Sequence, residues 1–295
     1  MRVCIIGLDG LEYEFVMKFD LKHLKQVEYG RVKINVGFLS TPTIWASFIT
    51  GLMPSEHGVI GLRWGNRLLN AVKNFVVKVG LAGLLDKSAF IQDKLHKMFA
   101  GQEMSFPIIK GKVPTIFDYA SNPIHISVPC YSEQDMPVYE ELRREVAQAL
   151  GNPLAEKRVL EKSRKVFEDK RRKCLRELEK DWDLFMVHFL YPDVFQHLRW
   201  YREDEVRGLY EELDETTRMF KERVDEEDTL VLVVSDHGHK RGLHTPHGFY
   251  SSNKRLGLHE PKITDFADII KQELGVPSEE EIEQVKRRLE EWGYF

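Results

Sequence analysis

Carboxylate and imidazole side chains gather in one stretch of the chain, Thr229 to Gly248, which reads TLVLVVSDHGHKRGLHTPHG. Its five consecutive apolar residues, Leu230 to Val234, have the length and β-branched content of a strand buried on both faces. Metal-binding side chains follow this run: Asp236, His237, His239, His244 and His247. Open α/β sheets build active sites at the edge where such strands end. The stretch therefore predicts a metal site at a sheet edge, completed by ligands from elsewhere in the chain.

Two further apolar runs that we expect to be strands are also followed by an aspartate. Asp9 follows Val3–Leu8, and Asp193 follows Leu184–Leu190. A single aspartate in such a place is commonly the cap of a helix. Three of them, two accompanied by histidines, favour a shared metal site instead.

Asp193 and His197 stand four residues apart in YPDVFQH. On a helical turn this spacing puts both side chains on one face, able to bind a single ion. The alternative is a capping aspartate and a surface histidine. Asp236 and His237 are adjacent, and a tight turn at Gly238 allows both to point at one centre. Carboxylate oxygen together with imidazole nitrogen favours zinc or manganese over magnesium.

The composition is that of a soluble globular protein, with 42% hydrophobic and 31% charged residues among 295. A net charge of -4 leaves no basic excess for neutralising phosphates, so we do not expect nucleic-acid binding. Cys4, Cys130 and Cys174 are an odd number without CxxC spacing, which suits a reducing cytoplasm better than a disulfide framework. The apolar run in MRVCIIGLDG is too short for a signal peptide or a membrane span. We therefore expect a cytoplasmic protein without a transmembrane segment.

Predicted strands alternate with predicted helices, which indicates an α/β fold with a mainly parallel central sheet sandwiched by helices. The expected strands are Val3–Leu8, Arg31–Val36, Ile124–Val128, Leu184–Leu190 and Leu230–Val234. A short helix is expected between the loop at Ser40–Pro42 and Gly51. The other expected helices are Thr115–Ala120, Val138–Lys180 with a break at Gly151–Pro153, Glu205–Val224, Ile263–Leu274 and Glu279–Trp292. We expect residues 1–295 to form a single α/β domain with a helical insert.

Two segments of this insert differ in character from the rest of the chain. Residues 63–110 include short apolar stretches, with Leu68–Phe99 at their centre, and the charges that interrupt them argue against a transmembrane helix. An amphipathic helical excursion is expected there, and it is open whether it forms a lid, a partner-facing surface or simple packing. Residues 135–180 carry charges of alternating sign, which are typical of solvated helices and not of a nucleic-acid-binding stripe.

The motifs of this chain resemble those of the alkaline phosphatase superfamily, and specifically its type I phosphodiesterase/nucleotide pyrophosphatase branch. They follow the family's order across nearly the whole sequence: IIGLDG (Ile5–Gly10), STPTIWASFITGLMPSEHGV (Ser40–Val59), YPDVFQH (Tyr191–His197), SDHG (Ser235–Gly238) and HTPHG (His244–Gly248). The pattern TP..W.SF.TG..P..HG is long and specific. The resemblance implies an alkaline-phosphatase-like fold and a hydrolase that cleaves phosphate esters with two divalent metal ions, zinc or manganese.

The resemblance also implies roles for individual residues. One ion would be held by Asp193, His197 and His244, and the other by Asp9, Asp236, His237 and Thr41. Thr41 would be the nucleophile that attacks phosphorus, because coordination to a metal ion activates a hydroxyl that is otherwise weak at neutral pH. A sulfatase is disfavoured, since that branch needs a cysteine or serine where this chain has Thr41.

Some features leave alternatives open. An asparagine that helps nucleotide pyrophosphatases hold phosphate would stand near Leu62, and Asn66 or Arg63 are the available substitutes. A phosphodiesterase or nucleotide pyrophosphatase acting on small phosphoesters or nucleotides is therefore the leading hypothesis. The alternatives are a phosphomonoesterase or phosphomutase on the same scaffold and a non-catalytic metal-binding module. The natural substrate and the oligomeric state stay undetermined.

Four other histidines also need an interpretation. His247 is the alternative to His244 as a ligand. His239 is expected either to contact a metal ligand without binding the metal itself or to lie exposed. His57 is expected to stabilise the turn in which it lies. His259 fits a substrate-binding role or a place on the surface.

Overall fold

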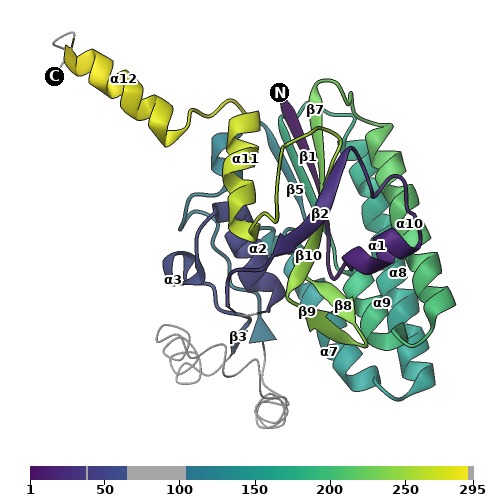
Figure 1. The fold of residues 1–295 in the computed structure, drawn as a ribbon. Helices are drawn as coiled ribbons and strands as arrows, with labels where there is room; N and C mark the ends of the chain where they lie inside the picture. The colour runs from purple at the N-terminus through teal and green to yellow at the C-terminus, as the bar shows by residue number, and fades with distance from the viewer. Residues whose placement is uncertain (38, 65–103, 292–295) are drawn as a thin grey trace.

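The computed structural model describes residues 1–37, 39–64 and 104–291, and a six-stranded sheet runs through its centre (Figure 1). The strands lie in the order β2-β10-β7-β1-β6-β5. Their bounds are β1 Arg2–Leu8, β2 Glu28–Lys33, β5 Pro123–Ile126, β6 Leu184–Phe189, β7 Thr229–Val234 and β10 His247–Ser252. β1 is parallel to β6 and β7, and β5 to β6, whereas β10 is antiparallel to both of its neighbours. The predicted α/β fold with a mainly parallel sheet is confirmed.

Helices cover both faces of this sheet (Figure 1). One layer contains α2 (Thr41–Thr50) and α11 (Phe266–Glu273), and the other contains α1 (Tyr13–Lys18), α8 (Pro153–Glu177) and α10 (Glu203–Lys221). α9 (Tyr191–Arg199) follows β6 directly, and α7 (Met136–Ala149) packs against α8 and α9. The C-terminal helix α12 (Glu279–Glu291) extends away from this body.

Shorter elements complete the described chain. They are α3 (Pro54–His57), the antiparallel pairs β3 (Arg63–Trp64) with β4 (Met104–Ser105) and β8 (Gly238–Lys240) with β9 (Leu243–Thr245), and 3-10 helices at Ile116–Tyr119, Glu133–Asp135 and Ile263–Asp265.

The central strands are almost entirely apolar because helices bury them from both sides. Every residue of β6 and β7 is buried. Along β1 the side chains alternate, so that Val3 and Ile5 join the core beneath α2 and α11 while Cys4 and Ile6 join the core beneath α8 and α10. The parallel register of β1 with β6 and β7 aligns the carboxyl ends of these three strands.

Local signals set the ends of the helices that matter for the site. Pro42 occupies the first turn of α2, and Gly51 ends this helix in the left-handed conformation with φ 75°. The charged segment 135–180 breaks between α7 and α8, where the side chain of Asn152 caps α8 by accepting from the backbone N–H of Ala155.

Two predicted elements differ in the structure. The strand expected at Arg31–Val36 begins and ends earlier, at Glu28–Lys33. It lies at the edge of the sheet, and its first residues are mostly polar and partly exposed. A search for apolar runs therefore misses where it begins. The helix expected at Thr115–Ala120 is a single 3-10 turn.

The HTPHG segment contains the turn-forming residues Pro246 and Gly248, yet β10 begins within it, at His247. Its pairing with both β7 and β2 is a tertiary contact that overrides the local turn signals of Pro246 and Gly248.

Leu68–Phe99, the centre of the expected helical excursion, lies outside the described residues, as does Asn66. Among the helices that the structure does describe, none combines the length and the apolar character needed to cross a membrane. The three cysteines are buried, and no disulfide joins them.

Candidate metal centre

Three neighbouring strands bring three aspartates to one edge of the sheet. β1 lies between β6 and β7 and is parallel to both, so the carboxyl ends of all three strands meet. Asp9 follows β1 directly, and Asp236 comes shortly after β7. Asp193 lies in the first turn of α9, the helix that follows β6. The predicted convergence of the strand-end aspartates is what the structure contains.

A first cluster consists of Asp9, Asp236 and His237, all fully buried. His237 Nε2 lies 3.2 Å from Asp9 Oδ1 and 3.5 Å from Asp236 Oδ2. The backbone N–H of Gly10 donates to Asp236 Oδ1 at 3.3 Å, while the other oxygen, Oδ2, faces His237. These side chains offer three ligand atoms that all lie within 4.8 Å of one another.

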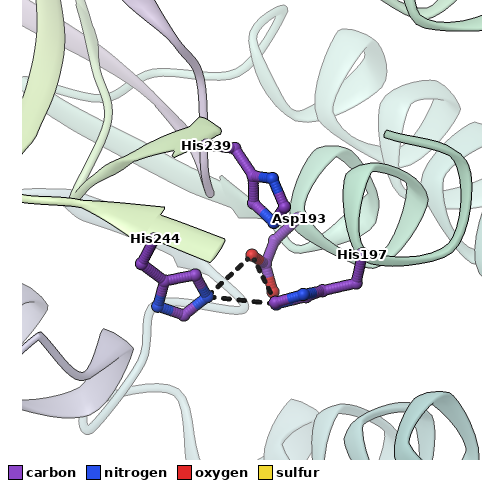
Figure 2. A group of neighbouring side chains, drawn as sticks. All are labelled: Asp193, His197, His239 and His244. Carbon is purple, nitrogen blue, oxygen red and sulfur yellow. Dashed lines mark hydrogen bonds and ion pairs between the residues drawn. The ribbon is translucent and has the colours of Figure 1, made fainter. Parts of the chain in front are cut away.

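A second cluster consists of Asp193, His197, His239 and His244 (Figure 2). Asp193 and His197 lie one turn apart on α9, with His197 Nε2 3.3 Å from Asp193 Oδ1. His239 and His244 face each other across the β8–β9 hairpin. His244 Nε2 lies 3.3 Å from Asp193 Oδ1 and 3.0 Å from His197 Nε2. The i, i+4 spacing on α9 therefore points both side chains into one group, as predicted.

The two clusters adjoin each other. Asp193 Oδ1 in the second lies 4.0 Å from His237 Nε2 in the first. The rings of His237 and His244 stack with their centroids 3.7 Å apart. The edge of the sheet thus carries one continuous group of candidate ligands with two centres.

Backbone carbonyls orient two of the imidazoles. His197 Nδ1 donates to the carbonyl of Gly242 at 3.1 Å, and His237 Nδ1 donates to the carbonyl of Gly238 at 3.1 Å. An imidazole whose Nδ1 carries the hydrogen has its lone pair on Nε2, which is how histidines are commonly fixed for metal binding. In both residues Nε2 is the atom that faces the carboxylates.

The three carboxylates have no basic partner other than histidine among the described residues. Each of Asp9, Asp193 and Asp236 keeps a buried oxygen that lacks a hydrogen bond within that part of the chain. Burying unpaired charge is costly, so this group needs positive charge from elsewhere. Divalent cations meet that need, and mixed carboxylate and imidazole donors suit zinc or manganese.

The pKa values of the cluster residues show the same excess of buried negative charge. Burial, and then repulsion from Asp236, raises the pKa of Asp9 well above its usual range. Burial opposes a charge on His237, but Asp236 and Asp9 beside it raise its pKa to about 10. Burial lowers the pKa of His239 to about 3 and that of His244 to about 4. His239 and His244 therefore offer neutral nitrogen donors, the form that metal ions bind.

His239 was expected either to support a metal ligand or to lie exposed, and the structure rules out the exposed alternative because it buries His239 in the second cluster. Its side chain is 2% exposed, and its Nε2 lacks a hydrogen-bond partner in the described chain. The pairing of β8 with β9 places His239 in the cluster, and no local sequence pattern indicates this pairing. His247 and His259 are exposed and lie outside both clusters. His57 holds its turn, as expected, since its Nδ1 accepts from the N–H of Val59 at 3.0 Å.

The β8–β9 hairpin is anchored by Glu12, a residue that the sequence did not single out. The Glu12 carboxylate accepts from the backbone N–H of His239 at 2.9 Å and from Thr245 Oγ1 at 3.1 Å. A Cβ atom at Gly238 would lie 2.4 Å from Glu12 Oε2, so only glycine permits this close approach. Glu12 thereby fixes the hairpin that presents His239 and His244.

Thr41, the expected nucleophile, is fully buried at the start of α2. One turn further along, Trp45 packs on Gly7 of β1 and on the ring of His188 in β6, with ring centroids 4.9 Å apart. Arg143 Nη1 on α7 donates to Thr41 Oγ1 at 3.2 Å. These contacts hold the amino end of α2 beside the strands that carry the clusters.

Two residues near the site escaped the sequence interpretation. Arg143 lies in the charged segment, where one arginine among many charges gives no signal. His188 is the one charged or titratable residue in the strand LFMVHF, and this break in an apolar run is a signal that was available. His188 is fully buried, and its Nε2 lies 3.5 Å from Asp9 Oδ2.

A family model described as type I phosphodiesterase / nucleotide pyrophosphatase matches residues 3–252. The chain belongs to this family, and it is a hydrolase that acts on phosphoester bonds. No curated protein matches the chain in a search of such proteins.

Several solved structures are similar to this one. The PH0037 protein from Pyrococcus horikoshii has a TM-score of 0.49 at 13% identity, over 94% of this chain and 98% of that one. Murine ectonucleotide pyrophosphatase / phosphodiesterase 5 has a TM-score of 0.42 at 11% identity, over 81% of this chain. The alkaline phosphatase PafA has a TM-score of 0.37 at 13% identity, over 80% of this chain. The matched region spans 57% of the murine protein and 62% of PafA.

Proposed function

We propose that the protein is a phosphodiesterase or nucleotide pyrophosphatase that uses two divalent metal ions and Thr41 as its nucleophile. Its substrates are small phosphoesters or nucleotides. One observation carries this proposal above the others: two ligand clusters adjoin at the same sheet edge, with Asp193 Oδ1 4.0 Å from His237 Nε2. Paired metal sites of this kind are typical of enzymes that displace groups at phosphorus.

The proposal assigns each side chain to an ion. One ion would be held by Asp193, His197, His239 and His244, and the other by Asp9, Asp236 and His237. Thr41, as the nucleophile, would add its hydroxyl oxygen to the ion at Asp9. Zinc suits these donors best, and manganese is the alternative. When bound, such ions neutralise developing charge on phosphoryl oxygens and lower the pKa of a hydroxyl that they contact.

Residues of the chain then carry out the displacement. The Thr41 hydroxyl loses its proton and Oγ1 attacks phosphorus, so that an Oγ1–P bond forms while the bond to the leaving oxygen breaks and that oxygen takes up a proton. Water later attacks the same phosphorus, the Oγ1–P bond breaks, and a proton from the water restores the Thr41 hydroxyl. A diester is thereby released as a phosphomonoester, and a monoester as inorganic phosphate. Arg143, whose Nη1 donates to Thr41 Oγ1 at 3.2 Å, is placed to donate to a phosphoryl oxygen that approaches this hydroxyl.

A phosphomonoesterase is the second candidate, and Arg143 is the observation that favours it. Within the described chain this guanidinium has no carboxylate partner, so its charge is available to the substrate. A terminal phosphate carries more negative charge than a diester and gains more from a cation beside it. The preference for phosphomonoesters over phosphodiesters therefore depends on how strongly Arg143 attracts the charge of the substrate.

A substrate panel on metal-reconstituted protein tests the proposal. Bis-p-nitrophenyl phosphate cleaved faster than p-nitrophenyl phosphate indicates the diesterase, and the reverse order indicates the monoesterase. Thr41→Val should remove turnover and keep the bound metal nearly intact, whereas Thr41→Ser keeps a hydroxyl and should retain part of the activity. Wild-type turnover in Thr41→Val would refute the nucleophile. Cleavage of neither ester with zinc or manganese supplied would favour a metal-binding module.

A further inference from the structure

The helix α12 extends away from the body of the protein and leaves its apolar side chains exposed (Figure 1). Ile282 and Val285 are 43% and 56% exposed, and Leu289 is half-buried. Because these residues follow one another at intervals of three and four positions, they form one stripe along the helix. A helix of 13 residues is only marginally stable by itself in water, and packing of such a stripe is what usually stabilises it. The stripe on α12 therefore calls for a partner that covers it.

A hollow of about 840 Å³ lies beside the first turns of this helix. Ile282 and Val285 line it from α12. Val276 and Pro277 line it from the segment between α11 and α12. A second helix laid along the stripe would place its own apolar side chains in this hollow. The surface open to a partner is thus the stripe on α12 together with the hollow beside it.

The two halves of α12 carry charges of opposite sign. Residues 279–284 have only acidic charges, and residues 286–288 have only basic ones. This order suits the dipole of the helix itself. It also makes the helix complementary to a second copy of itself that runs in the opposite direction, because the acidic half of each copy then lies beside the basic segment of the other.

The charges that flank the stripe favour one register of such a pair. Glu281 and Arg288 each directly precede a residue of the stripe, so both lie on the same flank. An antiparallel pair can place Ile282 of one copy on Val285 of the other. In that register Glu281 lies beside Arg288 of the second copy, and symmetry makes this contact twice. In a parallel pair the same two residues would be separated by about 10 Å along the axis.

The side chains of Glu281 and Arg288 are suited to this contact. Arg288 is exposed and has no ion pair within the described chain. Glu281 Oε2 accepts from the backbone N–H of Ser278 at 2.7 Å and from its hydroxyl at 2.9 Å, so this carboxylate is ordered before a partner binds. By contrast, Lys286 pairs with Glu283 of its own helix at 3.5 Å.

We propose that α12 is a dimerisation helix that packs antiparallel against α12 of a second copy of this chain. The two apolar stripes cover each other, Leu289 of each copy enters the hollow of the other, and Glu281 pairs with Arg288. Because the interface is small, we expect a dissociation constant in the micromolar range. α12 lies outside residues 3–252, which match the family model, so the hydrolase body should be unaffected by changes in this helix.

Sedimentation equilibrium of the full chain over a range of concentrations tests the proposal. The wild type should show a monomer–dimer equilibrium with a micromolar dissociation constant. Val285→Asp places a charge in the centre of the apolar contact and should raise this constant at least about 10-fold. Thermal unfolding of the variant at the wild-type Tm shows that the body of the protein is still folded.

Two charge variants test the direction of the helices. Arg288→Glu and Glu281→Lys should each weaken their own dimer by about 10-fold, because each brings like charges together twice. Mixed in equal amounts, the two variants should recover dimers close to the wild-type strength, since each then faces the opposite charge. Arg287→Glu makes the same change of charge on the face away from the stripe, and this control should dimerise like the wild type.

Two results would overturn the inference. One is a wild type that stays monomeric throughout the micromolar range, and the other is a dimer that Val285→Asp leaves unchanged. A dimer that is weakened by Val285→Asp but equally strong in Arg288→Glu and in the control would exclude the antiparallel arrangement. None of these measurements involves turnover or metal, so their outcome is independent of the proposed function.

Discussion

Arg143 on α7 donates a hydrogen bond to the hydroxyl of Thr41, with Nη1 and Oγ1 3.2 Å apart. The two residues are separated by about a hundred positions in the sequence, and only the packing of α7 against the end of the sheet brings them together. This contact places a positive charge beside the proposed nucleophile. In the proposed function Arg143 would hold the phosphate, a role for which the sequence offered only Asn66 or Arg63.

The first prediction concerns that charge. Arg143→Ala should raise the inhibition constant of inorganic phosphate by about 10- to 100-fold, because a hydrogen bond to a charged group contributes about 1.5–3 kcal/mol. The inhibition constant of Arg143→Lys should lie between those of the wild type and Arg143→Ala, since lysine keeps the positive charge but lacks the planar guanidinium group. Steady-state inhibition measured with p-nitrophenyl phosphate gives the constants. The neighbouring, exposed Arg144→Ala is the control, and an equal effect in both variants would contradict a specific contact.

The second prediction concerns the hairpin that carries two of the candidate ligands. Glu12→Ala removes an acceptor from the backbone N–H of His239 and from the hydroxyl of Thr245, which leaves buried donors unsatisfied. The free energy of unfolding should fall by about 1–3 kcal/mol, and zinc should bind more weakly to the second cluster. Urea unfolding and chelator competition measure the two effects. Glu14→Ala, at a half-exposed neighbour, should leave zinc binding unchanged; a loss there of the same size would count against the role of Glu12.

The third prediction is a dependence of stability on pH. Burial lowers the pKa of His57 from 6.5 to about 4, and its imidazole accepts from Val59 in the neutral form. The unfolded chain therefore binds more protons than the native state between these values, so stability falls as the pH drops from about 6.5 to about 4. The loss assignable to His57 is about 3 kcal/mol at most.

Comparison with a variant isolates this contribution. His57→Asn keeps an acceptor for Val59 but cannot be protonated, so its unfolding free energy should change less between pH 7 and pH 4.5 than that of the wild type. Denaturant titrations at several pH values measure the difference. The exposed His259→Asn should follow the wild-type curve, and parallel curves for all three proteins would contradict the prediction.

The fourth prediction separates metal binding from folding. Asp9 is fully buried among other carboxylates, which raises its pKa well above the usual range, so Asp9→Asn should stabilise chelator-treated protein. Each kcal/mol gained should raise Tm by about 2–4 °C in a protein of this size. With zinc supplied the order should reverse, because ligand binding stabilises only the protein that retains the site. Thermal melts with zinc and with chelator provide the comparison, and the exposed Asp181→Asn should show neither effect.

The sequence determined much of the site because many of its signals are local. Apolar runs identified β1, β6 and β7, and each strand was followed by its aspartate. The four-residue spacing of Asp193 and His197 needed only one helical turn to place both side chains in one cluster. The motif around Thr41 resembles that of a known family, and the family model that matches residues 3–252 confirms this resemblance.

What the tertiary structure decided are contacts between residues far apart in the chain. His239 joined the second cluster because β8 pairs with β9 and Glu12 anchors the turn. β10 formed where local turn signals indicated a loop, because β2 and β7 pair with it on both sides. Arg143 reached Thr41, and His188 reached Asp9, through the packing of α7 and β6 at the sheet edge. No periodicity encodes such contacts, since they depend on the relative placement of whole elements and not on neighbours along the chain.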